Sequence, residues 1–184
     1  AITILAVRPV DAADPAAIRA FYTDNPPQTA QGALDYATAH FETGNTGEAE
    51  ATLVLAWRTM PMSDAMRAEY LAAHGDLLAP HHVARTASRL WDGARGDAAD
   101  MYPLLSDDQV ALARARGGLQ ALAGNVDSLI EAVPAALQDD AGLAHDRFEW
   151  RIRKARWDDA KSLLLERSIS AAALGRPEAW GNRR

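Results

Sequence analysis

The stretch Trp150-Arg-Ile-Arg-Lys-Ala-Arg-Trp-Asp-Asp-Ala-Lys-Ser-Leu-Leu-Leu-Glu166 has the pattern of two helices that meet at a tight turn. Ala155 stands five residues before Ala160, and an acidic residue directly precedes the second alanine. A glycine or other small residue at the first position ends a helix where the backbone needs a left-handed conformation. A small alanine at the second position lets the next helix fold back closely against the first. The stretch therefore predicts an antiparallel helix pair.

The same frame occurs twice more upstream, from Gly44 to Ala49 and from Gly93 to Ala98. Three copies of one turn indicate three copies of one helix pair, which is the joint of a helical-repeat array. The equivalent alanines at positions 49, 98 and 160 are separated by 49 and then 62 residues, whereas a regular tetratricopeptide array repeats every ~34 residues. We therefore predict an all-α fold, an irregular tetratricopeptide-like α-superhelix of antiparallel helix pairs.

The composition is that of a folded, helical protein. Hydrophobic residues make up 48% of the 184-residue chain and charged residues 24%, which excludes intrinsic disorder. Alanine and leucine dominate while β-branched residues are sparse, which favours helices. No linker divides the sequence, so we expect one structural unit over residues 1–184. Because the chain starts without methionine and stops in what reads as a helix start, we expect it to be a fragment of a longer chain.

Helical periodicity predicts roughly ten helices and no sheet. We expect one helix from Ser63 to His74, with Gly75 as its stop. Gly117-Gly118 falls inside another predicted helix, where close helix contact or a bend explains the loss of helix propensity. The apolar run Ile2–Val7 is too short to span a bilayer, so we expect no transmembrane segment.

Charge and residue types argue against several functions. A net charge of −6 argues against a non-specific nucleic-acid binder. The chain has no cysteine, which excludes disulfides and thiol catalysis. His74, His81 and His82 lack a carboxylate at a ligand spacing, so we expect no metal site. The chain has no phosphate-binding glycine loop, serine nucleophile elbow or metalloprotease helix, and we expect neither a cofactor nor a catalytic residue.

Three acidic pairs stand at predicted helix starts: Asp107-Asp108, Asp139-Asp140 and Asp158-Asp159. Carboxylates stabilise the positive end of a helix, so capping explains them better than the paired carboxylates of glycoside chemistry. One dense basic cluster interleaves with Phe148, Trp150 and Trp157; it consists of Arg147, Arg151, Arg153, Lys154 and Arg156. Two interpretations stay open for it: contact with an anionic polymer, or a solvated helix face with aromatic core residues behind it.

Four segments together resemble the superhelical domain of soluble lytic murein transglycosylases, in the form found in α-proteobacteria. They are Leu90-Trp-Asp-Gly-Ala-Arg-Gly-Asp-Ala-Ala99, Val133-Pro-Ala-Ala-Leu-Gln-Asp-Asp-Ala-Gly-Leu143, the third turn and Arg176-Pro-Glu-Ala-Trp180. The likeness covers the chain from about Thr29 onward. It implies a ring-like α-superhelix followed by a linker and a C-terminal lysozyme-like domain, which cleaves peptidoglycan glycan strands to 1,6-anhydromuramyl products.

The family's catalytic glutamate stands in a Glu-Ser-Gly context followed by Gly-Leu-Met-Gln, and this sequence contains neither motif. The resemblance therefore implies a non-catalytic scaffold of a periplasmic enzyme, inactive alone, that shapes access of murein glycan strands to the missing domain. It also implies glycan contacts along the inner surface, for which the candidates are Arg147, Trp150, Arg151, Lys154 and Arg156. The alternative is an independent tetratricopeptide-like adaptor that binds a peptide or protein partner in its groove.

Overall fold

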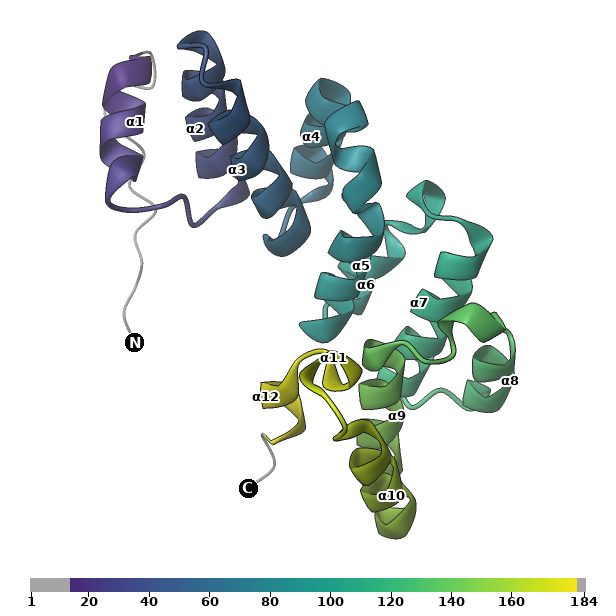
Figure 1. The fold of residues 1–184 in the computed structure, drawn as a ribbon. Coiled ribbons are helices and arrows are strands. Elements are labelled where there is room, and N and C mark those ends of the chain that lie inside the picture. The colour runs from purple at the N-terminus through teal and green to yellow at the C-terminus, as the bar shows by residue number, and fades with distance from the viewer. Residues whose placement is uncertain (1–13, 182–184) are drawn as a thin grey trace. The chain divides into compact units, whose positions relative to one another are not determined.

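The structure is a computed structural model, and it describes residues 14–181. Within this range the regular elements are all helices, and no strand occurs (Figure 1). The prediction of an all-α fold is confirmed. None of the helices in the described range has the length and apolarity needed to cross a membrane. The run Ile2–Val7 lies outside the described residues.

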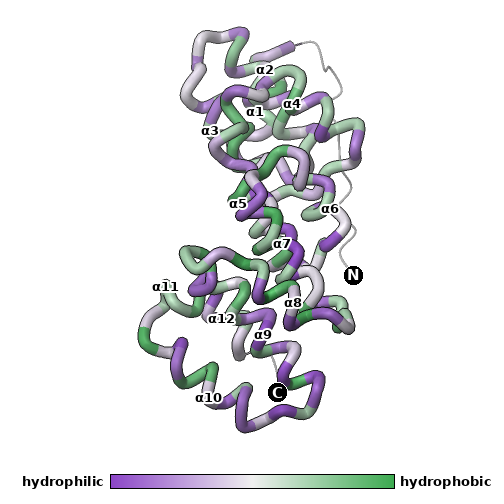
Figure 2. The backbone as a smooth tube through the Cα atoms, turned by 90° about the vertical axis from the view of Figure 1, so that its right-hand side faces the viewer, coloured by the Kyte–Doolittle hydropathy of each residue, from purple (hydrophilic) through white to green (hydrophobic). Residues whose placement is uncertain are grey.

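The residues form two compact units, one up to Arg85 and one from Thr86, so the division falls inside helix α5 (His82–Trp91). Each unit has its own buried residues. The colours in Figure 2 change between hydrophobic and hydrophilic within single helices such as α10 (Trp157–Arg167), as expected for helices with one buried face. The single continuous superhelix over residues 1–184 stays a prediction.

The first unit holds α1 (Pro15–Thr23), α2 (Ala30–Glu42), α3 (Thr46–Thr59), α4 (Asp64–Leu78), the 3-10 helix η1 (Ala79–His81) and the start of α5. Trp57 is fully buried, and its ring stacks against Tyr70 with 6.3 Å between centroids. The Tyr70 hydroxyl donates a 2.7 Å hydrogen bond to the carbonyl of Ala30. Arg85 lies 4.7 Å above the Trp57 ring and donates to the carbonyl of Met60. These contacts join α2, α3, α4 and α5.

The predicted end of the helix at His74 is confirmed as a break between two helical stretches of α4, but Gly75 does not end the helical region, because the second stretch continues to Leu78. The helix is kinked at His74, where φ is −136° and ψ is 24°. The His74 ring stacks on Phe41 with 5.8 Å between centroids, and Leu78 beyond the kink is fully buried. Burial of Leu78 stabilises the resumed helix after the one-residue interruption.

The second unit holds the rest of α5, α6 (Arg95–Ala99), η2 (Tyr102–Leu104), α7 (Asp107–Gln120), α8 (Val126–Glu131), η3 (Ala135–Leu137), α9 (Ala141–Arg153), α10, α11 (Ala171–Leu174) and α12 (Pro177–Trp180). One core cluster packs α7, α8 and α9 around Leu119 and Leu143. A second packs α9, α10 and α12 around Phe148 and Trp180. Helix α9 therefore contributes to both clusters.

All three predicted turns have the expected left-handed residue, with φ of 77°, 74° and 56° at Gly44, Gly93 and Ala155. In each turn the next residue donates its N–H to the carbonyl five residues back; the bonds are Asn45 to His40, Ala94 to Arg89 and Arg156 to Arg151. This pattern is the Schellman motif. The alanines in the first turns of the second helices are buried, with 0%, 0% and 2% exposure at Ala49, Ala98 and Ala160. The three turns are confirmed.

A fourth turn of the same kind ends α7 at Leu122, whose φ is 55°. The N–H of Ala123 donates to the carbonyl of Gly118 at 3.0 Å. This turn was not predicted, because leucine rarely takes a left-handed conformation. Gly118 explains part of it, since a Cβ at this position would overlap the side chain of Leu129 on α8. Close helix contact is thus the role of this glycine.

The acidic pairs lie at helix starts, as predicted. Asp107-Asp108 and Asp158-Asp159 occupy the first turns of α7 and α10. The Asp140 carboxylate accepts the N–H of Leu143 at 2.8 Å and caps α9. Asp139, just before this cap, binds Arg167 of α10 at 3.2 Å.

Candidate functional site

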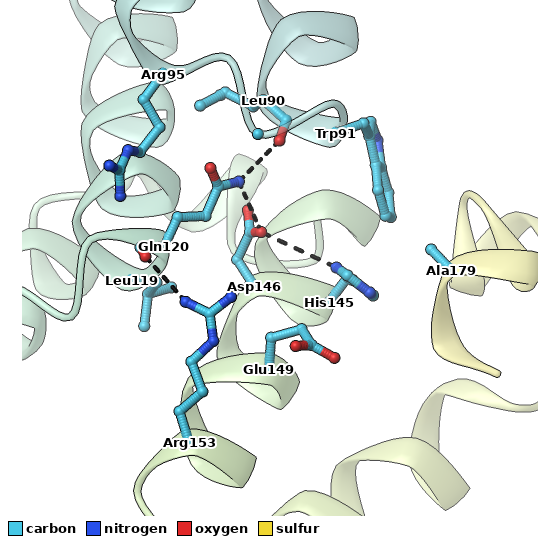
Figure 3. Close-up of a pocket in the computed structure, with 11 residues that line it drawn as sticks. Leu90, Trp91, Arg95, Leu119, Gln120, His145, Asp146, Glu149, Arg153 and Ala179 are labelled. Atoms are coloured by element: carbon cyan, nitrogen blue, oxygen red, sulfur yellow. Dashed lines mark hydrogen bonds and ion pairs between the residues drawn. The ribbon is translucent and has the colours of Figure 1, made fainter. Parts of the chain in front are cut away.

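The second unit contains a pocket of about 490 Å³ whose walls come from the α5–α6 turn, α7, α9 and α12 (Figure 3). Its polar and charged lining residues are Arg95, Gln120, His145, Asp146, Glu149 and Arg153. Helix α9 supplies the last four of them because residues three and four apart share one helix face.

A buried ion pair between α7 and α9 includes one of the residues that line the pocket. Arg116 of α7 donates from Nε to Oδ2 of Asp146 at 2.7 Å, and their side chains are 2% and 6% exposed. A Cβ at Gly142 would overlap the Arg116 guanidinium, so a side chain at this position would displace Arg116 from its present place in the pair. The negative charge of Asp146 in the pocket lining is therefore compensated by Arg116.

Gln120 links the ion pair to the opposite wall. Its Nε2 donates to Oδ1 of Asp146 and to the carbonyl of Leu90, both at 2.9 Å. Both partners are hydrogen-bond acceptors. If the amide were reversed, Oε1 would face the Leu90 carbonyl oxygen and Oδ1 of Asp146 without a hydrogen between them, so the observed orientation is the one the site requires. The Oε1 atom is buried and accepts no hydrogen bond within residues 14–181. In Figure 3 this oxygen is turned toward the side of the pocket where Arg95 lies.

Two arginines lie at the open side of the pocket. Arg95 and Arg153 are both exposed, and Arg153 donates a 3.1 Å hydrogen bond to the backbone carbonyl of Gln120. Glu149 is the one lining carboxylate besides Asp146, which Arg116 neutralises. Glu149 has an interaction within the protein as well, so the two exposed guanidinium groups make the open side of the pocket favour a small anion over a cation.

Trp91 forms an aromatic wall that is already engaged within the protein. The guanidinium carbons of Arg116 and Arg176 lie 5.3 Å and 5.5 Å from its ring centre, within cation–π range. The His145 ring lies 4.9 Å away. Arg176 also binds the neighbouring Asp92 at 2.9 Å. Trp91 therefore holds the pocket wall in place and is not a free stacking platform for a sugar.

The predicted basic cluster lies on α9 and at the third turn, and part of it is used to join α9 to α10. Arg151 donates to the carbonyl of Asp159 at 2.9 Å, and Arg156 forms a 2.6 Å ion pair with its carboxylate. Trp150 is partly buried against the core of α7 and α9, with Arg156 5.8 Å from its ring centre. Lys154 is exposed at the end of α9. Arg151, Arg156 and Trp150 thus have packing roles whether or not they contact a glycan.

Arg147 is the half-buried member of this cluster. Burial lowers the pKa of its guanidinium, and the nearby charges of Arg151 and Arg167 lower it further. Burial is the largest cause of this pKa shift, and the nearby Glu166 acts against the effect of the two arginines.

The histidines do not converge. His74 stacks on Phe41 and His82 lies 5.6 Å from the Trp57 ring centre. No group of three or more histidine, aspartate or glutamate side chains in the described part of the chain is arranged to hold a metal ion.

Apart from Arg153, which belongs to the predicted basic cluster, the polar and charged residues of the pocket were missed at the level of sequence. Arg116 and Asp146 are 30 residues apart and belong to no motif. A signal was nevertheless present, because Arg116 falls in the apolar stripe of its helix with Leu112 and Leu119, and Asp146 follows the apolar Leu143 and Ala144. Opposite charges at apolar positions of two helices predict a buried pair.

Comparison with known proteins gives no match: no family model, no curated protein and no solved structure corresponds to this chain. The family resemblance therefore rests on the sequence segments named above, and membership of the family stays a prediction.

Proposed function

We propose that this chain is the non-catalytic helical scaffold of a periplasmic peptidoglycan lytic transglycosylase, which shapes the access of murein glycan strands to a C-terminal lysozyme-like domain. The observation that carries the proposal is that segments which resemble this family, far apart in the sequence, lie against one another. Arg176 of the closing segment binds Asp92 of the Leu90–Ala99 segment at 2.9 Å. Next to it, Gly175 adjoins both Trp91 and Ala141. The resembling segments thus belong to one packed unit.

The chemistry of the pocket agrees with a scaffold. Cleavage of a glycosidic bond needs a carboxylic acid that can protonate the leaving oxygen. Both oxygens of the Asp146 carboxylate already accept hydrogen bonds, Oδ2 from Arg116 and Oδ1 from Gln120, and the other lining carboxylate, Glu149, also has an interaction within the protein. We therefore expect no clearing when the purified chain is run in a peptidoglycan zymogram. A cleared band would refute the non-catalytic role.

We assign glycan contact to Arg147 and Lys154 of the basic cluster, together with Trp150. Arg147 and Lys154 are suitable for testing because Arg151 and Arg156 also hold the α9–α10 turn through Asp159. Arg147→Gln combined with Lys154→Gln is expected to lower retention on insoluble peptidoglycan about threefold at low salt, from the loss of one half-buried and one exposed positive charge. The exposed Lys161 on α10 is the matched control, and Lys161→Gln should retain the parent's binding.

Retention should be measured at about 50 mM and about 300 mM salt, because screening weakens contacts between exposed charges. Equal retention of parent and double variant at both salts would remove the basic cluster from the proposal. The gene provides an independent test. A reading frame that continues past Arg184 into a lysozyme-like domain with Glu-Ser-Gly agrees with the scaffold, whereas a stop codon there favours the independent adaptor.

A further inference from the structure

We infer that the pocket between the α5–α6 turn, α7 and α9 binds a small carboxylate that also carries an amide or hydroxyl donor, and that within the proposed function this ligand is a muramyl unit of the glycan. The identification of the ligand rests on the proposed function, while the carboxylate and donor chemistry rests on the pocket itself. No residue of the basic cluster on α9 that was predicted from sequence as a glycan contact lines this pocket.

The donor requirement follows from Gln120. Its amide is oriented by two acceptors, the Leu90 carbonyl and Asp146, so Oε1 is committed to accepting a hydrogen bond. That oxygen is buried in the pocket wall without a partner among the described residues. Buried acceptors are nearly always paired, so the site is complementary to a ligand N–H or O–H.

The carboxylate requirement follows from charge. Asp146 is paired with Arg116, and Glu149 also has an interaction within the protein, whereas Arg95 and Arg153 are exposed and line the pocket. Guanidinium groups bind carboxylates with favourable geometry, so the two arginines are suited to an anionic carboxylate ligand.

The size of the pocket agrees with one sugar unit. Its volume of about 490 Å³ lies within the range of small-molecule sites, which is roughly 300–1,000 Å³. The ring of His145 lies at one wall, and its Nε2 is a second buried polar atom without a partner in the described range. N-acetylmuramic acid combines one carboxylate with an amide N–H and hydroxyl groups, which meets each requirement.

The experiment compares N-acetylmuramic acid with N-acetylglucosamine, which lacks only the lactyl ether and its carboxylate. Binding is followed on the 184-residue chain by amide chemical shifts. We expect saturable binding of N-acetylmuramic acid, with shifts in α7 and α9, and at least about tenfold weaker binding of N-acetylglucosamine. Equal binding of the two sugars, or no shift at about 20 mM N-acetylmuramic acid, would overturn the inference.

Arg95→Gln should weaken N-acetylmuramic acid binding about fivefold or more. Arg114 is the control, because it is exposed on α7, lies 5.6 Å from the Tyr102 ring centre and does not line the pocket. Arg114→Gln should bind like the parent, and an unchanged affinity of Arg95→Gln would overturn the assigned role of charge. N-acetylalanine forms a third arm, and tighter binding of this acyl amino acid than of the sugar would overturn the muramyl assignment.

Failure of this inference is separable from failure of the proposed function. If N-acetylmuramic acid does not bind while Arg147→Gln and Lys154→Gln still lower retention on peptidoglycan, the pocket inference falls and the scaffold stands. If the sugar acid binds while the parent chain is not retained on peptidoglycan and the gene ends at Arg184, the scaffold falls and the muramyl assignment with it.

Discussion

The Arg116–Asp146 pair offers the sharpest test of the second unit. Asp146→Ala leaves the Arg116 guanidinium buried without its counter-ion, since the arginine side chain is only 2% exposed. Removing one partner of a buried pair typically costs about 3–5 kcal/mol. Gln120 Nε2 also loses one of its two acceptors. We therefore expect Asp146→Ala to lower the free energy of unfolding of this unit by about 3–5 kcal/mol.

Urea denaturation followed by far-ultraviolet circular dichroism measures this change. The control is the pair between Arg67 and Asp64, in which the Asp64 carboxylate lies at the surface, since the Asp64 side chain is 92% exposed and the Arg67 side chain 13%. Surface pairs contribute about 0–1 kcal/mol, so Asp64→Ala should differ little from the parent. A loss below about 1 kcal/mol for Asp146→Ala, equal to that of the control, would refute the view that the pair is desolvated.

A double variant separates charge from packing. Arg116→Met combined with Asp146→Leu removes both charges and keeps apolar volume, and such replacements are often neutral or stabilising. We expect the double variant to regain at least about half of the stability lost in Asp146→Ala. If it is as unstable as the single variant, the loss comes from disturbed packing around Gly142 and not from an unpaired charge.

Three further changes test the turns and the first unit. Gly93→Ala should lower the free energy of unfolding by about 1 kcal/mol, because φ is 74° at this position. Ala155→Gly should raise it by up to about 1 kcal/mol, because the alanine already has a strained positive φ. Urea titrations that give the same sign for both variants would contradict this. Ala160→Trp should cost about 1–3 kcal/mol by overpacking, and an unchanged melting temperature would place Ala160 at the surface. Burial, assisted by His81, lowers the pKa of His82 below 6.5. The unfolded chain therefore binds the proton more readily, and the free energy of unfolding falls as the pH drops below about 6.5. His82→Gln should make this decline smaller. If the pH profiles of parent and variant are parallel, His82 is not the source of the decline.

The sequence alone was sufficient for the helical class and for three of the four Schellman turns described above within residues 14–181. Both features depend on local rules: the 3.6-residue spacing of apolar side chains, and the need for a small residue at positive φ. Gly44 and Gly93 predict their turns because glycine, which has no Cβ, readily adopts a positive φ. Ala155 was found because it has the same spacing to a following alanine as these two glycines. The glycan contacts assigned to α9 stay predictions, although their positions on one helix were readable from spacing.

Only the tertiary structure decided the turn at Leu122, the continuation of α4 beyond Gly75 and the pocket. Leu122 takes a disfavoured conformation where α8 packs on Gly118, and α4 resumes after its kink to bury Leu78. Arg116 and Asp146 meet across two helices, and their pairing orients Gln120. A local pattern cannot specify such an arrangement, because a buried charge is stable only where a distant segment brings the opposite charge into hydrogen-bonding distance.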